Sequence, residues 1–111
     1  MLLHIIGTDD LRAARESGEI VTPSLAEEGF VHCSYENQVL TPANQRFSGR
    51  HDLVLLVLDP QQISSPLVIE DSYGSGTEFP HVYGPIPVEA IIRIVEFPPN
   101  ADGSFGLPVL R

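Results

Sequence analysis

The sequence predicts an α+β protein in which a mixed or antiparallel sheet carries a few helices. Short apolar, β-branched runs outnumber the segments with helical periodicity, and the helical segments fall early in the chain. Ten prolines and nine glycines are typical of many turns and short elements rather than of a helix bundle. A chain of 111 residues corresponds to one domain, over residues 1–111.

The first part of the chain predicts a strand, a helix and a helical turn. Residues 2–6 are apolar and form the strand. Thr-Asp-Asp at 8–10 supplies N-cap chemistry for a short amphipathic helix, which Gly18 ends. A capping-box pattern, Ser-x-x-Glu, begins a helical turn over residues 24–28, and Gly29 stands where a C-cap belongs.

The middle of the chain predicts two strands around a second helix. Residues 30–34 have strand composition, and the helix is expected over about 35–47. Within it, Thr41 would be the cap and Pro42 the first helical position, because proline is tolerated there. The continuous apolar run at 53–58 indicates a strand buried on both faces.

The last part predicts two more strands. Residues 66–70 form one and residues 91–97 the other, and a flexible loop over 71–78 follows the first of them. The irregular tail, 98–111, combines turn residues with apolar ones, so it either folds back over the core or frays.

The charge balance argues against a nucleic-acid-binding protein. The net charge is −9, and all six basic residues are arginines, so a phosphate backbone is repelled as the main partner. One local anion site built from arginine and backbone N–H groups remains compatible with this charge. Cys33 is the single cysteine, and no segment is long and apolar enough to span a bilayer, so we expect a cytoplasmic protein.

Histidines are the first candidates for a functional site. His4, His32 and His81 lie in or beside expected strands, whereas His51 lies in a polar turn and is expected to be solvated. Each of the three is, taken singly, consistent with a hydrogen-bonded structural histidine. Three of them in so small a domain also predict one shared cleft, and the sequence leaves both interpretations open.

Other polar residues beside these histidines are weaker candidates. On a strand, Cys33 faces away from its neighbours and is expected in the core, while Ser34 is either a hydroxyl donor or the cap of the next helix. Glu70 ends an apolar strand and must be paired, solvated or functional. Tyr83 with Gly84 offers a stacking ring and a close backbone approach, or simply a packed turn.

Two sequence blocks resemble those of DUF952, a bacterial family of unassigned activity. Residues 28–34, EGFVHCS, are similar to its EGFIHCS hallmark, and residues 79–85, FPHVYGP, resemble its FPHIYGP block. The remaining pattern fits His4, Ser24-Leu25, Asn44 with Phe47, and Glu70, so that the resemblance covers about 1–97.

The resemblance implies a fold and a ligand class. The family is grouped with the ADP-ribosyltransferase-like superfamily, which implies a small curved or split mixed β-sheet with two or three short helices, and NAD as ligand. In that reading His4 hydrogen-bonds ribose hydroxyls, His32 and Ser34 line the nicotinamide end, and Tyr83 stacks on a ring, with Gly84 beside it.

The same resemblance implies catalytic roles. Glu70 would stabilise the positive charge that develops at the anomeric carbon, with Glu78 as a competing candidate, and His81 would position a phosphate or act as acid or base. The pattern departs from the RNA 2′-phosphotransferases of that superfamily, because no arginine precedes His32. This departure argues against an arginine-lined phosphate site.

Three hypotheses follow. The first is an NAD- or ADP-ribose-binding transferase-like enzyme with a His-lined pocket and a small-molecule partner. The second is a non-catalytic ligand- or protein-binding module that keeps the fold. The third is a metal-dependent hydrolase in which His4, His32 and His81 converge, although no local spacing in the sequence predicts a metal site.

Overall fold

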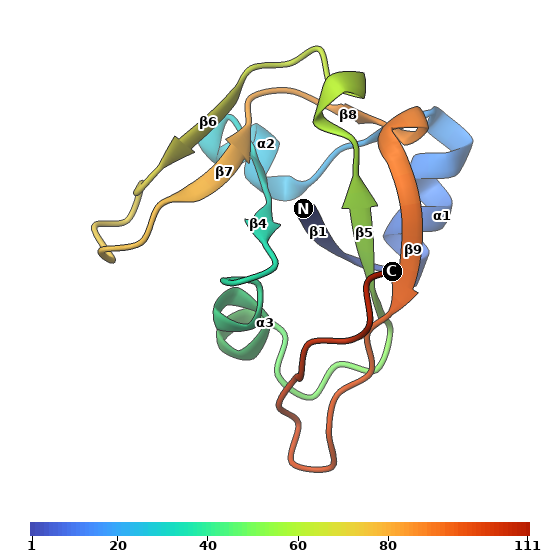
Figure 1. Cartoon of the computed structure of the whole chain (residues 1–111). Coiled ribbons are helices and arrows are strands. Elements are labelled where there is room, and N and C mark those ends of the chain that lie inside the picture. Colours follow the sequence, from blue (N-terminus) through green and yellow to red (C-terminus); the bar gives the residue numbers. More distant parts are fainter.

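Nine strands form three small antiparallel sheets in the computed structural model, which describes residues 1–111. The four-stranded sheet has the order β4-β1-β5-β9, the three-stranded sheet β3-β7-β6, and the third pairs β2 with β8 (Figure 1). The strands are β1 (Leu2–Gly7), β2 (Glu19–Ile20), β3 (Val31–His32), β4 (Ser34–Tyr35), β5 (Leu53–Leu58), β6 (Leu67–Glu70), β7 (Phe79–Val82), β8 (Ile86–Pro87) and β9 (Ile91–Glu96).

Three α-helices accompany the sheets, which confirms the α+β class and the expected number of helices. They are α1 (Thr8–Ser17), α2 (Pro23–Glu28) and α3 (Leu40–Arg46), with 3₁₀ turns at Pro60–Gln62 and Val88–Ala90. Every pair of strands is antiparallel, which is one of the two alternatives left open, so the mixed sheet that the resemblance implied was wrong. None of the helices has the length and apolar character that crossing a bilayer requires.

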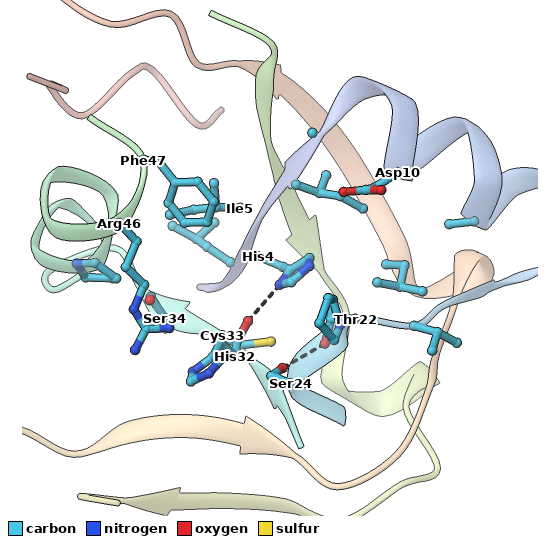
Figure 2. Close-up of a pocket in the computed structure, with 18 of the residues that line it drawn as sticks. His4, Ile5, Asp10, Thr22, Ser24, His32, Cys33, Ser34, Arg46 and Phe47 are labelled. Carbon is cyan, nitrogen blue, oxygen red and sulfur yellow. Dashed lines mark hydrogen bonds between the residues drawn. The ribbon is translucent and has the colours of Figure 1, made fainter. Parts of the chain in front are cut away.

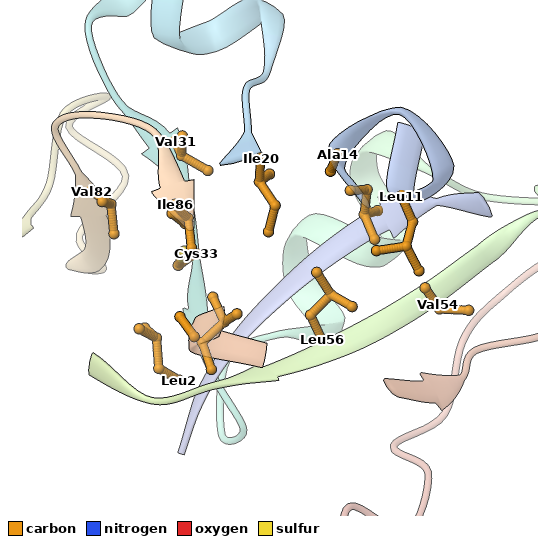
Figure 3. Close-up of a cluster of buried hydrophobic side chains, with 13 residues drawn as sticks. Leu2, Leu11, Ala14, Ile20, Val31, Cys33, Val54, Leu56, Val82 and Ile86 are labelled. Carbon is orange, nitrogen blue, oxygen red and sulfur yellow. The ribbon is translucent and has the colours of Figure 1, made fainter. Parts of the chain in front are cut away.

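The two longest neighbouring strands, β1 and β5, carry a core on each face. All six residues of β5 are buried, as the apolar run predicted. The even-numbered side chains of both strands pack with α1, Ile20, Val31 and Val82 in one apolar cluster (Figure 3). The odd-numbered ones pack with α3 and the C-terminal tail in the other.

The C-terminal tail folds back over the second of these clusters. Phe105 and Leu110 are 4% and 6% exposed, and the Phe105 ring stacks on Phe97 with 4.7 Å between centroids. Asn44 Oδ1 accepts a hydrogen bond from the backbone N–H of Phe105. Of the two alternatives left open for residues 98–111, the structure therefore shows the folded one.

The expected strand over 30–34 is interrupted at Cys33. The N–H of Cys33 donates to the carbonyl of Pro80 at 3.1 Å, but proline has no N–H with which to return the bond. The ladder between β3 and β7 therefore ends there. The chain then changes sheets, because Ser34 pairs with Leu3 of β1.

Helix ends confirm the stop signals and correct the start signals. Gly18 and Gly29 end α1 and α2 in the left-handed conformation, with φ of 90° and 89°. The helix α1 begins at Thr8, within the predicted 8–10, but the N-caps are Gly7 and Thr22 without a side-chain cap bond, so the capping roles of residues 8–10 and of the capping box were wrong. The Ser24 hydroxyl instead donates to the carbonyl of Phe30.

The second helix is shorter than the expected 35–47. Turns occupy residues 36–39, where the amide side chain of Gln38 accepts from the N–H of Tyr35 and holds the chain in a turn. The helix α3 begins at Leu40, so Thr41 is not its cap and Pro42 is not its first residue. Pro42 is tolerated because the first four N–H groups of a helix have no intrahelical acceptor.

Candidate functional site

A cavity of about 660 Å³ lies along the part of β1 that β4 leaves uncovered. The strand β4 pairs only with Leu2 and Leu3, so the edge of β1 from His4 to Gly7 is open on that side. The segments α1 and 19–24 line one side of the cavity, and α3 with Phe47 lines the other (Figure 2). The volume lies within the range of about 300–1,000 Å³ that is usual for small-molecule sites.

His4 is the most deeply buried polar group of the cavity wall. Its side chain is 5% exposed, and Nδ1 lies 2.7 Å from the backbone carbonyl of His32. Because a carbonyl oxygen only accepts, Nδ1 carries the proton and Nε2 is a bare acceptor. Nε2 is buried and has no hydrogen-bond partner. Burial lowers the pKa of His4 below its ordinary value, so the ring is neutral.

His32 lines the same cavity and makes a second set of polar contacts. Its Nε2 lies 3.3 Å from Glu28 Oε1 and 3.3 Å from the hydroxyl of Tyr73, which itself donates to Glu28 Oε2. A carboxylate only accepts, so Nε2 of His32 carries the proton. Partial burial, and then the positive charge of Arg46, lower the pKa of His32.

His81 belongs to a neighbouring cluster that does not line the cavity. Its ring is 1% exposed and stacks on Phe30, with 3.9 Å between centroids. His81 Nδ1 lies 3.0 Å from Glu70 Oε1, which also accepts from the hydroxyl of Tyr83. These two hydrogen bonds, that of Tyr83 first, lower the pKa of the Glu70 carboxyl. His32 connects this cluster to the cavity, since the His32 and His81 rings lie 5.5 Å apart.

The register of β3 and β7 brings His32 and His81 together. His32 lies directly opposite His81, so both side chains point to the same face of the sheet. The next pair along the strands is Cys33 and Pro80, and it is a hydrogen-bonded pair, because the N–H of Cys33 donates to the carbonyl of Pro80. The His32–His81 pair is then non-hydrogen-bonded, with its side chains closer together. The His32 carbonyl consequently faces away from β7 and accepts from His4.

Two arginines, Arg46 and Arg50, also line the cavity. Arg50 is held by Asp52 through two hydrogen bonds, of 2.9 and 2.7 Å. Arg46 makes no ion pair, and its guanidinium lies over the ring of Tyr73, 5.7 Å from the centroid. Ser34, a residue that is 6% exposed, lines the same cavity as Arg46 (Figure 2).

The predicted site residues thus fall into two groups and one exception. His4, His32 and Ser34 line the cavity, and Glu70, His81 and Tyr83 form the cluster beside it. Gly84 belongs to neither group, because a Cβ there would lie 2.2 Å from the hydroxyl oxygen of Ser65, which favours the packed turn. Glu78 is exposed, and its backbone carbonyl accepts from Gln38.

The burial of Cys33 was predicted correctly, whereas three residues of the site were not predicted. Cys33 is 3% exposed in the core, as expected, and burial raises its thiol pKa to about 12. Sequence reasoning missed Arg46, Glu28 and Tyr73. Nothing in the sequence around Arg46 indicates a functional role. Two signals were present for the others, since Glu28 lies inside the EGFVHCS block and Tyr73 is an aromatic residue in a loop rich in Gly and Ser.

These features define a class of protein, namely an antiparallel α+β domain with a histidine-lined cavity beside a Glu-His-Tyr cluster. The chain belongs to the DUF952 family, described as a protein family of unknown function, whose family model matches residues 5–94.

Two solved structures of one bacterial protein are similar to this chain. The crystal structure of protein CC0527 from Caulobacter crescentus is 30% identical, with a TM-score of 0.85 over 96% of this chain and 93% of that one. The solution NMR structure of CC0527 has a TM-score of 0.80 at 30% identity, over 93% and 89% of the two chains. No curated protein matches the chain.

Proposed function

We propose that the cavity binds a ligand of the NAD or ADP-ribose type, as in ADP-ribosyltransferase-like proteins. The observation that carries this proposal is the bare Nε2 of His4, a buried acceptor in the cavity wall without a partner. A buried polar atom left unpaired costs about 1–3 kcal/mol. A ribose hydroxyl that donates to Nε2 removes this cost, so this buried acceptor favours a ligand rich in hydroxyl groups.

The fold and the remaining wall support the same ligand class. The cavity opens between separate antiparallel sheets and has the volume of a small-molecule site. Its wall combines apolar side chains with many polar ones, His32 and Ser34 among them, and polar groups fix the orientation of a ligand in such sites.

A transferase-like reaction is the enzymatic form of this proposal. The glycosidic bond of NAD would break with its electron pair on the nicotinamide, and an acceptor's nucleophile would bond to the anomeric carbon. Glu70 would stabilise the charge that develops there, and His81, oriented by Glu70, would take the acceptor's proton through Nε2.

A non-catalytic ligand-binding module is the second candidate, and one observation favours it. Glu70 does not line the cavity, and its Oε1 already accepts from Tyr83 and contacts His81. Glu70→Gln separates the two candidates: in an enzyme it abolishes turnover of NAD and leaves the affinity largely unchanged. In a binding module the unmodified chain shows no turnover either.

The metal-dependent hydrolase has no support in the arrangement of the side chains. No three side chains of the His, Cys, Asp or Glu type lie together in a geometry that holds a metal ion. His4 and His32 meet through a ring nitrogen and a backbone carbonyl, not through two ring nitrogens.

Thermal unfolding with and without ligands tests the proposal. We expect NAD or ADP-ribose to raise the midpoint of the full chain by mass action. His4→Asn keeps an N–H at the position of Nδ1, because Asn Nδ2 and His Nδ1 are the same number of bonds from Cα, but it lacks Nε2. The ligand-induced shift should be lost in His4→Asn and kept in His51→Asn, the exposed matched control. No shift with either nucleotide in the unmodified chain would refute the proposal.

A further inference from the structure

We infer that Arg46 and Ser34 form an anion subsite of the cavity, which takes a phosphate or carboxylate group of the ligand. This inference rests on the proposed function, since it names the part of the same cavity that binds the charged end of the ligand. His4, by contrast, lies further towards Asp10 (Figure 2). The cavity thus has a cationic end and a hydrogen-bond-accepting end.

Arg46 is a cation without an ion-pair partner in a strongly acidic protein. The chain carries −9 net charge from fifteen acidic and six basic residues. Arg12, Arg50 and Arg111 are each paired with a carboxylate, whereas Arg46 makes no ion pair although it is on the cavity wall. An anion is therefore repelled by most of the surface, and this guanidinium is open to it. The planar fork of arginine suits the paired oxygens of phosphate and carboxylate groups.

Ser34 supplies a second donor at the same end. Ser34 is 6% exposed, and it lies on the cavity wall. The strand β4 fixes its position, because Ser34 pairs with Leu3 at the point where the open edge of β1 begins. A hydroxyl held by a strand and a guanidinium on the wall of the same cavity can both donate to an anionic group of one ligand.

Tyr73 contacts the guanidinium of Arg46, and His32 lies close enough to feel its charge. The Tyr73 ring lies beneath the Arg46 guanidinium and its hydroxyl is hydrogen-bonded to Glu28, so the loop that carries it restrains Arg46. The nearby charge of Arg46 contributes to the lowered pKa of His32. With His32 neutral, Arg46 is the positive group beside it on the cavity wall, and the Glu28 carboxylate, which does not line the cavity, is hydrogen-bonded by Tyr73 and His32.

Titration of the full chain, labelled with ¹⁵N, with inorganic pyrophosphate tests the subsite without a nucleotide. The Nε–H resonance of Arg46 is identified by its loss in Arg46→Gln, and we expect pyrophosphate to shift it. The exposed Arg93 on β9 also makes no ion pair and lies outside the cavity, so its resonance is the internal control and should not shift.

Calorimetric binding of ADP-ribose and of the uncharged adenosine then measures the contribution of each donor. Arg46→Gln should weaken ADP-ribose binding by about 10- to 100-fold, the effect of a lost hydrogen bond to a charged group, and change adenosine binding less than about twofold. Ser34→Ala should weaken ADP-ribose by about 2- to 10-fold, and Arg93→Gln should leave it unchanged. A thermal midpoint for each variant confirms that it is folded.

The outcomes separate this inference from the proposed function. If pyrophosphate shifts Arg46 but ADP-ribose does not bind, the anion subsite stands and the nucleotide proposal falls. If ADP-ribose binds equally well to the folded Arg46→Gln variant, the subsite is refuted and the nucleotide proposal stands. If neither pyrophosphate nor ADP-ribose shifts the Arg46 resonance, the subsite is refuted.

Discussion

The burial of His4 makes the stability of the fold depend on pH in a defined direction. Burial lowers its pKa in the folded chain, while in the unfolded chain the imidazole titrates near its ordinary value of about 6.5. Between these two values the unfolded state binds one proton more than the folded state. Acidification through this window therefore favours unfolding, with a slope of up to about 1.4 kcal/mol per pH unit. His32, whose pKa is also lowered, adds to the slope in the same direction.

Urea unfolding at a series of pH values between 7.5 and 5 measures this slope. The free energy of unfolding of the unmodified chain should fall on acidification below about pH 6.5, by the linkage relation above. His4→Asn should flatten the profile by up to one proton's contribution, whereas His51→Asn should follow the unmodified chain. Carboxyl groups titrate below about pH 5 and leave this range clear. Parallel profiles for His4→Asn and the unmodified chain would show that His4 is not a buried neutral group.

Three further perturbations test the packing. Gly84→Ala places a Cβ 2.8 Å from Cβ of Ser65 and should cost about 1–3 kcal/mol in urea unfolding, with recovery in the double variant Gly84→Ala/Ser65→Gly. Gly106→Ala meets open space and should change stability by less than about 0.5 kcal/mol. Phe105→Ala should cost about 3–5 kcal/mol if the tail is part of the core, and a frayed tail would give almost none. The Cys33 thiol, with a pKa raised to about 12, should react with a disulfide reagent only as fast as the chain opens, and rapid labelling of the native protein would contradict its burial.

The sequence predicted those features that depend on local pattern. The buried strand β5 followed from an uninterrupted apolar run, and the ends of α1 and α2 followed from Gly18 and Gly29, which need no neighbours to adopt positive φ. The predicted side-chain caps failed because a cap depends on what else the hydroxyl can reach. Ser24 reached the carbonyl of Phe30 across the turn instead of its own helix.

The side of the cavity that α3 provides could not be predicted from local sequence pattern. Arg46 is a surface residue of a short helix, and nothing in its local sequence indicates that α3 packs beside the open edge of β1. Its partner Tyr73 lies on a loop far along the chain, so their contact is purely tertiary. No arginine directly precedes His32, but Arg46 of α3 lines the same cavity.

His32 shows why three histidines distant in sequence form one arrangement. Its side chain meets His81 because the two occupy a non-hydrogen-bonded pair, and the same geometry turns its carbonyl away from β7 towards His4. One register therefore sets both contacts. A slip of one residue would place Val31 opposite His81 and reverse every side chain of β3, which would expose the apolar face of the strand. Because Val31 and Val82 anchor the opposite face in the core, the burial of apolar surface fixes the polar arrangement as well.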